Sequence, residues 1–373
     1  MKQTSVKIGI IALAGLMATA FAACTKVEAS QGGDIDYTKP ILLSQQLQAE
    51  LDGTKSLAEN NDMRNESFGV LGYQYNVAGI GGSDGTWLTN RAQAKVNVFA
   101  TTTGGTTYKV PEIVSCSDAG VCSYTPLQYW DKQKNYAFFA YYPTGLAVKD
   151  ENGGTYSTST MGAPYVEYSV VSSGTTFNNF SQMQDVLTAY SIDRNVKDGR
   201  NVNLNFQHRL FCIAVKALNM ENVPVTISKL DVKISGIDNQ SVRLALDRSL
   251  DDKLTKFGQK QSPTFNVINT TAEAYTIPQG EKHTVSGSNN IMLIPPQRVN
   301  DNNALNGTIS MKYTKGTGSE VTVNNISITN IDRVDFEAGR KYYLNITFSG
   351  DGVFVELVTS PRWTDAPVDI EFE

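Results

Sequence analysis

One short stretch of the chain has the residue types and spacing of a serine nucleophile. The residues "GGSDG" (81–85) fit the G-x-S-x-G pattern, which presents a serine hydroxyl for attack on an ester when a strand precedes it and a helix follows. No helical pattern follows in "VAGIGGSDGTWLTN", and small polar residues match this pattern easily. We therefore interpret Ser83 as a turn residue, and we keep ester hydrolysis, abolished by Ser83→Ala, as an alternative.

The chain offers few other groups for catalysis or metal binding. In an extended "NFQHRLFCIAV", His208 shares one face with Phe206 and Leu210, so it is predicted to be a hydrogen-bonded core residue. His283 lies in the polar turn "PQGEKHTVSG" and is predicted to be at the surface. Without further clustered ligands, the sequence predicts no metal, no cofactor and no enzyme.

Two of the four cysteines favour an oxidising compartment. Cys116 and Cys122 flank the turn-like "SDAGV" between two strand-like runs, so they are predicted to form a hairpin disulfide. A metal site is the alternative, but no third or fourth ligand lies nearby. Cys212 lies in the apolar "LFCIAVKAL" and is predicted to be a buried thiol.

Cys24 ends an N-terminal segment that is built like a secretory signal. Lys2 and Lys7 precede an apolar run over 8–23, which is short for a membrane span of ~20 residues. Cys24 follows two alanines at the end of this run. This order resembles a bacterial lipoprotein signal, although Phe21 stands where leucine is more usual. We expect residues 1–23 to be removed and Cys24 to carry diacylglycerol and palmitate; a plain signal is the alternative.

The charge of the chain narrows the possible partners. Removal of Lys2 and Lys7 changes the formal net charge from −5 to −7. This mild acidity argues against nucleic acid as a partner and against a basic membrane-binding patch. No second apolar run reaches membrane-spanning length, so the lipid would be the only anchor in the outer membrane.

Strand patterns dominate the rest of the chain, and helical patterns are scarce. Runs of β-branched and aromatic residues, separated by Gly, Asn, Asp and Ser clusters, predict an all-β fold of antiparallel sandwiches. The runs lie at 67–77, 94–101, 135–143, 202–218, 225–236, 242–247, 290–297, 307–314, 341–348 and 353–358.

The length and one polar segment predict two domains. About 350 residues would follow the signal, and the polar stretch 191–201 separates two strand-rich halves. We expect a tether at 24–38, an N-terminal β-sandwich domain at 39–195 and a C-terminal one at 196–373.

The segment 41–53 fits two structures. Leu43, Leu47 and Leu51 recur every four residues before Gly53, as in a helix with a glycine after its end. Leu47, Ala49 and Leu51 also alternate with polar residues, as in a strand. Both interpretations stay open.

Aromatic residues gather in "YWDKQKNYAFFAYYP" (129–143). Strands recruit aromatic residues for packing, so we expect most of these rings in a core. The alternative is a solvent-exposed platform for stacking sugars, formed by Trp87, Tyr129 or Trp130.

Several stretches resemble, in the same order, blocks of the fimbrillin family, whose members are subunits of type V pili of Gram-negative anaerobes. The stretch "YWDKQKNYAFFAYYP" (129–143) resembles their W-x(5)-Y-x-F-x-A-Y-x-P block, and "LNFQHRLFCIAVKA" (204–217) resembles their F-x-H strand. The stretch "MLIPPQ" (292–297) resembles a P-Q strand of the family, and "FEAGRKYYLNITF" (336–348) an A-G-x-x-Y strand. The last stretch, "RWTDAPVDIEFE" (362–373), resembles a Trp-containing C-terminal strand.

The resemblance implies two tandem transthyretin-like β-sandwich domains and assembly by strand exchange. Such a subunit is exported as a lipoprotein, cut after a basic residue beyond its first strand, and completed by a strand from the next subunit. Segment 41–52 occupies the place of the removable strand, and Lys55 or Arg64 that of the cut. The donor strand would carry Val368, Ile370 and Phe372 on one face, unless that strand completes its own domain. The helix-compatible first segment and Lys rather than Arg at the nearer site depart from the family pattern.

The sequence thus predicts a non-enzymatic structural and adhesive subunit at the outer-membrane surface. Its expected partners are other pilus subunits, the outer membrane through the lipid, and a host or bacterial receptor. The alternative is a surface lipoprotein that binds glycans without polymerising.

Overall fold

The computed structural model describes residues 35–47, 63–92, 94–96, 98, 101–103, 106–108, 111–149, 164–169, 176–177, 183–199, 201–238, 242–247, 260–269, 274–285, 291–296, 306–329, 331, 336–350 and 352–359. Within these residues, helix is confined to α1 (Trp87–Asn90), the 3-10 turn η2 (Val196–Asp198) and the 3-10 residue Ile331. The predicted all-β class is therefore confirmed. None of the helices in the described residues is long and apolar enough to cross a membrane.

The largest sheet has eight strands. Seven lie along one path, and β4 (Lys95–Val96) pairs with β3 beside it. Strand β15 lies beyond the boundary predicted at 195/196 yet pairs in this sheet; the division into two domains stays a prediction. The path is β2 (Leu42–Leu47), β15 (Asn201–His208), β14 (Leu187–Arg194), β10 (Lys134–Tyr142), β3 (Ser67–Asn76), β7 (Glu112–Cys116) and β8 (Cys122–Ser123).

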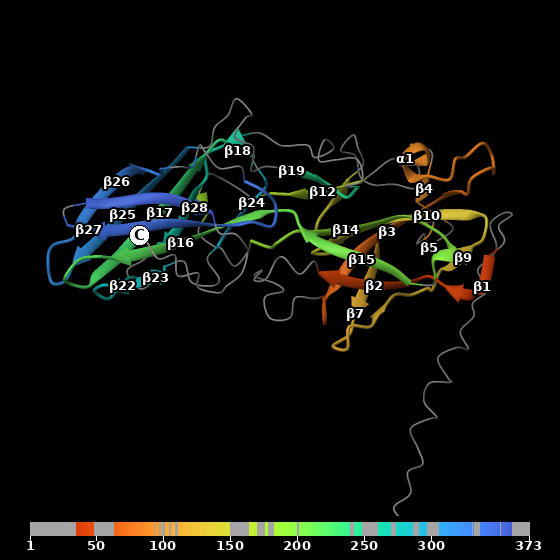
Figure 1. The fold of residues 1–373 in the computed structure, drawn as a ribbon, viewed down its shortest axis with the longest axis horizontal. Helices are drawn as coiled ribbons and strands as arrows, with labels where there is room; N and C mark the ends of the chain where they lie inside the picture. Colours follow the sequence, from red (N-terminus) through yellow and green to blue (C-terminus); the bar gives the residue numbers. More distant parts are fainter. Residues whose placement is uncertain are drawn as a thin grey trace, which may run out of the picture. The chain divides into compact units, whose positions relative to one another are not determined.

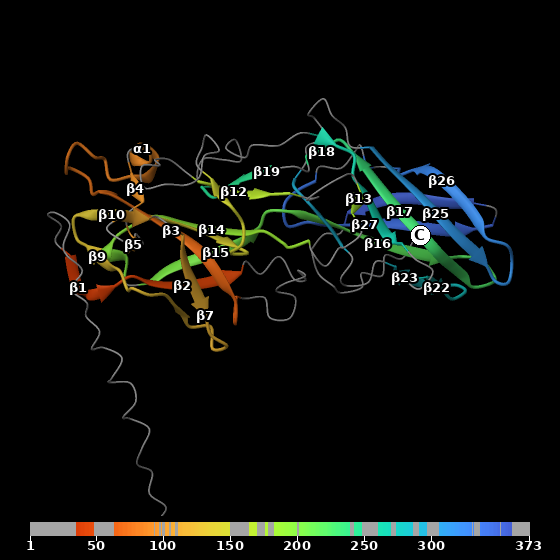
Figure 2. The ribbon, with the colours of Figure 1, turned by 180° about the vertical axis from the view of Figure 1, so that it is seen from behind.

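Two further sheets are formed mainly by the second half of the chain (Figures 1 and 2). The first has the order β13 (Thr176–Phe177), β21 (Thr264–Ile268), β17 (Val225–Ser235), β25 (Asn306–Lys315) and β26 (Val321–Ser327), with β22 (Tyr275–Ile277) beside β17. The second has the order β23 (Lys282–Thr284), β16 (Phe211–Asn219), β27 (Lys341–Ser349) and β28 (Gly352–Thr359), with β24 (Met292–Ile294) beside β16.

The remaining described strands form small sheets. One of them joins chain segments from both halves, because β12 pairs with β19 from Tyr165↔Ala245 to Tyr168↔Val242. The small sheets are β1 (Ile35–Pro40) with β9 (Tyr129–Asp131), β11 (Val148–Lys149) with β12 (Tyr165–Tyr168) and β19 (Val242–Ala245), β18 (Ile237–Asp238) with β20 (Lys260–Gln261), and β5 (Thr101–Thr103) with β6 (Thr106–Tyr108).

Most strand pairs are antiparallel, as predicted, but three of those described are parallel. These are β2 with β15, β16 with β27, and β13 with β21. The predicted antiparallel sandwiches did not include these three parallel pairs. Local patterns predict hairpins, whereas these three pairs join strands that are far apart in the chain and meet only after long connections.

Buried side chains form two clusters, and β10 contributes to both. Tyr136 and Phe138 belong to the first cluster, together with Phe68, Trp130 and Phe206. Because successive strand residues point to opposite faces, their neighbours Ala137, Phe139 and Tyr141 belong to the second cluster, which also contains the buried residues of β16, β17 and β27. The eight-stranded sheet is therefore covered on both faces along β10.

The structure decides the first part of the segment that the sequence left open, whereas residues 48–53 lie outside the described residues. Residues 42–47 form strand β2, with Leu43 buried and Leu42 and Gln46 exposed. The period of two prevails because the backbone of β2 pairs with β15 over six consecutive residues.

Candidate functional site

Strand β2 is an edge strand that closes a core. It pairs in parallel with β15 from Leu42↔Asn201 to Leu47↔Phe206. Strand β8 lies at the other end of the sheet's strand order, yet β2 and β8 are in contact, so the curled sheet brings its two edges together. The cluster enclosed in this way includes Ile41, Leu43, Val202, Leu204 and Phe206.

The N-terminal end of β2 is anchored by the segment that follows β8. The backbone N–H of Ile41 donates to Gln128 O at 2.8 Å, and the Tyr124 hydroxyl donates to Ile41 O at 2.7 Å. Burial raises the pKa of the Tyr124 hydroxyl, so this donor stays protonated. Ile41 and Leu43 are 0% and 5% exposed, and burying two such side chains stabilises the docked strand by about 3–6 kcal/mol.

The chain re-enters the described region at a tight turn that leads into β3. Met63 is fully buried, and its N–H donates to Gln45 Oε1 of β2 at 3.1 Å. Glu66 N–H closes the turn by donating to Met63 O at 3.1 Å, and Asn65 has φ 61°, in the left-handed region that asparagine tolerates. Arg64, one of the two predicted cleavage positions, is exposed in this turn. Lys55, the other, lies outside the described residues.

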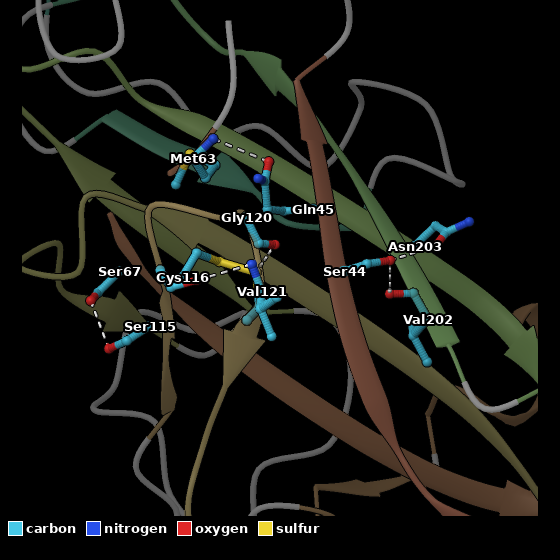
Figure 3. The surroundings of a disulfide bond; sticks show 12 residues. Ser44, Gln45, Met63, Ser67, Ser115, Cys116, Gly120, Val121, Val202 and Asn203 are labelled. Carbon is cyan, nitrogen blue, oxygen red and sulfur yellow. Dashed lines mark hydrogen bonds between the residues drawn. A yellow bond between two sulfur atoms is a disulfide. The ribbon is translucent and has the colours of Figure 1, made fainter. Parts of the chain in front are cut away.

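The β7–β8 hairpin packs against this turn, and a disulfide joins Cys116 to Cys122 across it (Figure 3). The two cysteines are directly paired in the ladder, with a Cα–Cα distance of 4.0 Å. The N–H of Cys116 donates to Glu66 O at 2.9 Å, and Asn65 Nδ2 donates to Asp118 Oδ1 at 3.2 Å. The figure shows Ser44 of β2 directed toward Asn203 and Gln45 directed toward Met63.

The Ser83 motif lies in a hydrogen-bonded loop that the short helix α1 follows. The hydroxyl of Ser83 donates to Asn76 O at 2.9 Å or to Asn90 Oδ1 at 3.0 Å, and accepts from Gly85 N at 3.0 Å. None of the hydrogen bonds described for Ser83 involves a histidine. The loop is organised by Asp84, whose pKa is lowered by hydrogen bonds from Thr89, first of all, and from its other neighbours. This arrangement supports the interpretation of Ser83 as a turn residue.

His208 is a core histidine, as predicted. It is 2% exposed, and its Nδ1 is hydrogen-bonded to the fully buried carboxylate of Asp185. His283 is partly exposed and lies between two partners, with Nδ1 3.0 Å from the Tyr275 hydroxyl and Nε2 2.5 Å from Glu281 Oε2. Among the described residues, no group of three or more His, Cys, Asp and Glu side chains could hold a metal ion.

The expected burial of the rings in 129–143 is confirmed for Trp130, and the alternative of an exposed sugar-stacking platform is wrong for Trp87 and Trp130. Trp87 is 0% exposed and packs edge-on against Tyr73 at a centroid distance of 5.1 Å. Trp130 is 1% exposed and packs edge-on against Tyr136 at 4.8 Å. Tyr129 is partly exposed. The rings are buried because each packs in one of the two clusters that cover β10, Trp87 with Phe139 and Trp130 with Tyr136.

Other predicted site residues lie outside the described part of the chain. These are the lipidation residue Cys24 and the donor-strand residues Val368, Ile370 and Phe372. Cys212 is buried in β16 and takes no part in the disulfide.

Sequence reasoning missed Gln45, Met63 and Asp118 as residues of the β2 site. Their partners are 18 residues or more away in the chain, for example Asn65 for Asp118 at a separation of 53. The sequence predicts Arg64 as a cleavage position because it is basic. Nothing in the sequence pattern indicates that a disulfide hairpin lies against this turn.

Comparisons with known proteins confirm the family that the sequence blocks resemble. A family model described as fimbrillin-like matches residues 83–361. Among solved structures, the chain is similar to a fimbrial protein from Bacteroides vulgatus, with 17% identity and a TM-score of 0.55, over 87% of this chain and 100% of that chain. At this identity the likeness shows a shared fold.

Two further structures are more distant. One is a candidate cell adhesion protein from Bacteroides uniformis, with 12% identity, a TM-score of 0.45 and coverage of 88% of this chain and 100% of that chain. The other is a candidate cell adhesion protein from Bacteroides ovatus, with 13% identity, a TM-score of 0.44 and coverage of 86% and 96%. No curated protein matches the chain.

Proposed function

Because the chain belongs to the fimbrillin-like family, we propose that it is a structural and adhesive subunit of a type V-like pilus, assembled by strand exchange. The observation that carries the proposal is the position of β2. It is an edge strand, its backbone pairs with β15, and its side chains close a core. An edge strand of this kind is a part of the fold that a strand from another chain can replace.

Loss of β2 would create an acceptor site. The backbone groups of Asn201–Phe206 that face β2 would lose their partners, and Val202, Leu204 and Phe206 would lose the cover of Ile41 and Leu43. Unpaired strand edges bind extended chains, and buried pockets select side chains at alternate positions. The acceptor site therefore requires an extended segment with apolar residues two positions apart.

The C-terminal segment of a neighbouring copy is the proposed donor. Val368, Ile370 and Phe372 alternate with Asp369, Glu371 and Glu373, so an extended strand would have one apolar and one acidic face. The apolar face matches the spacing of Ile41, directly before β2, and Leu43 in β2.

Export as a lipoprotein fits the same role. We propose that Cys24 carries the lipid and that the protein acts at the outer-membrane surface, with other pilus subunits as partners and a surface receptor as the adhesive target. The disulfide between Cys116 and Cys122 supports export, because disulfides persist in oxidising compartments. We also propose two transthyretin-like sandwich domains as the architecture.

Truncation of the proposed donor tests this function. A chain that ends at residue 364 should be exported and folded but should form no high-molecular-weight polymer in material sheared from cells. The matched control replaces the acidic face, Asp369→Asn with Glu371→Gln, and should still polymerise. Polymers of the truncated chain, equal in amount to those of the native chain, would contradict the proposal.

A further inference from the structure

The contacts on the two sides of Arg64 go to different parts of the molecule. On the N-terminal side, Met63 N–H donates to Gln45 of β2, and its side chain lies in the same cluster as Ile41 and Leu43. On the C-terminal side, Asn65 is bonded to Asp118. The bond from Glu66 N–H to Met63 O joins the residues that flank Arg64 on its two sides.

The residues after Arg64 are bonded to a cross-linked element. Glu66 O accepts from Cys116 N–H at 2.9 Å, next to the disulfide. The hairpin tip is closed by Ser117 N–H to Val121 O at 2.9 Å and Gly120 N–H to Ser117 O at 2.8 Å. The disulfide closes a ring too short to change its shape much, so this tip is a fixed support for Asn65 and Glu66.

The same hairpin is a wall of the β2 site. Strand β8, at the other end of the sheet's strand order, contacts β2. Cys116 belongs to the cluster that contains Ile41 and Leu43, and Cys122 packs against it. The hairpin therefore touches both the segment that would leave and the segment that would stay.

We propose that the disulfide-stapled β7–β8 hairpin is the retention element of the strand-exchange site. It holds the chain from Asn65 onward while the segment that ends at Arg64 leaves, and it keeps the vacated site in a shape that accepts a new strand. This inference rests on the proposed function, because it assumes that β2 is exchanged.

The chemistry of cleavage at Arg64 is consistent with retention. Hydrolysis by an arginine-specific protease adds water across the Arg64–Asn65 peptide bond and leaves a carboxylate on Arg64 and an ammonium group on Asn65. The new ammonium group arises one residue from the Glu66 anchor and on the residue that already bonds to Asp118. The new positive charge and the Asp118 carboxylate attract each other, whereas the new negative charge remains on the leaving segment.

Peptide binding to the cleaved protein tests the hairpin's role. The folded full chain is cut with an arginine-specific protease, and mass spectrometry checks for a new N-terminus at Asn65 that is absent in Arg64→Gln. A fluorescent synthetic peptide of residues 35–47 is then bound to the cut protein, and its anisotropy gives the affinity. Three hairpin states are compared with the native one: Cys116→Ser with Cys122→Ser, the native disulfide reduced after folding, and Asp118→Ala.

We expect peptide binding to be weakened about tenfold or more without the disulfide, and about threefold by Asp118→Ala. The matched control is Ser115→Ala, on the same hairpin, which loses an exposed bond of 2.9 Å to Ser67 and should bind like the native protein. Equal binding by native, reduced and Asp118→Ala proteins would overturn the retention role and leave strand exchange intact. A native cut protein that binds no peptide would overturn strand exchange itself.

Discussion

Trp87 Nε1 donates a hydrogen bond to Asp247 Oδ2 at 2.7 Å, and both residues are 0% exposed. The two residues are 160 positions apart in the chain. The ring centroid of Trp87 lies 5.2 Å from that of Phe139 of β10. The backbone N–H of Trp87 donates to Asp193 Oδ1 at 2.6 Å. Trp87 therefore ties the loop around α1 to strands from distant parts of the sequence.

Replacement of Trp87 should destabilise the fold. Trp87→Phe keeps a ring in the cluster but removes the donor to a buried carboxylate, so we expect unfolding free energy to fall by about 1–3 kcal/mol. Urea unfolding followed by fluorescence or circular dichroism measures the change. The neighbouring Leu88→Ala, at a side chain that is 61% exposed, should change stability by less than about 0.5 kcal/mol. Equal effects of the two variants would show that the hydrogen bond between Trp87 and Asp247 adds nothing to the free energy of unfolding.

Gly69 should not tolerate a side chain. A Cβ atom at Gly69 would lie 2.4 Å from Cε1 of Tyr141, which is 3% exposed on the neighbouring strand. We expect Gly69→Ala to lower the midpoint of urea unfolding by an amount equivalent to about 1–3 kcal/mol, because the ring must move within a packed cluster. Gly145→Ala is the control, since nothing lies within 4 Å of its Cβ position. A stable Gly69→Ala protein would mean that Tyr141 has room to move.

Leu43 should anchor β2 more strongly than its neighbour Leu42. Leu43 is 5% exposed and Leu42 is 39% exposed, on opposite faces of the same strand. Leu43→Ala should destabilise the chain by about 2–3 kcal/mol and raise the hydrogen-exchange rate of the β2 and β15 amides. Leu42→Ala should leave both quantities nearly unchanged. Similar exchange rates in the two variants would contradict a role of Leu43 in holding β2.

Stability should fall at high pH because buried tyrosines resist ionisation. Burial raises the pKa of Tyr136 and of Tyr141 from 10.0 to about 12. The folded pKa lies above the unfolded one, so this contribution is fully present below pH 10 and is lost as the pH rises through 12. Urea unfolding at a series of pH values should therefore show constant stability up to about pH 9 and a steep decline between about 10 and 12.

Tyr141→Phe provides the control for this pH dependence. The variant removes the ionisable group, and burial is the cause of its raised pKa. The decline between pH 10 and 12 should become shallower in the variant while stability at neutral pH is nearly kept. An unchanged pH profile would show that Tyr141 ionises as easily in the folded state as in the unfolded state.

The sequence predicted the strands well, because their patterns are local. The run 135–143 became β10, and the inward position of His208 followed from simple alternation in β15. The sequence could not predict that both faces of β10 are buried, since all the residues from Tyr136 to Tyr142 are apolar or aromatic and give no polar face. The residues that cover its second face come from strands such as β16 and β27, more than 60 positions later.

Long-range pairing explains most of what the sequence left open. Segment 41–53 fitted both a helix and a strand, and pairing with β15 at 201–206 makes its described residues 42–47 a strand. The alternative of an exposed platform at Trp87 and Trp130 is wrong for the same reason, because residues that are distant in the chain enclose both rings. The candidate site was predicted as a removable strand and a basic residue, whereas the hairpin that supports Asn65 came from the structure.

The N-terminus of the assembled protein tests the central claim most directly. High-molecular-weight material sheared from the cell surface would be separated from monomer, and the N-terminal residue of each would be determined by mass spectrometry. Strand exchange predicts that the polymer begins after β2, at Ser56 for a cut at Lys55 or at Asn65 for a cut at Arg64, and the retention role of the hairpin predicts Asn65. A polymer whose subunits all begin at a lipid-modified Cys24, with β2 still present, would contradict strand exchange at this site.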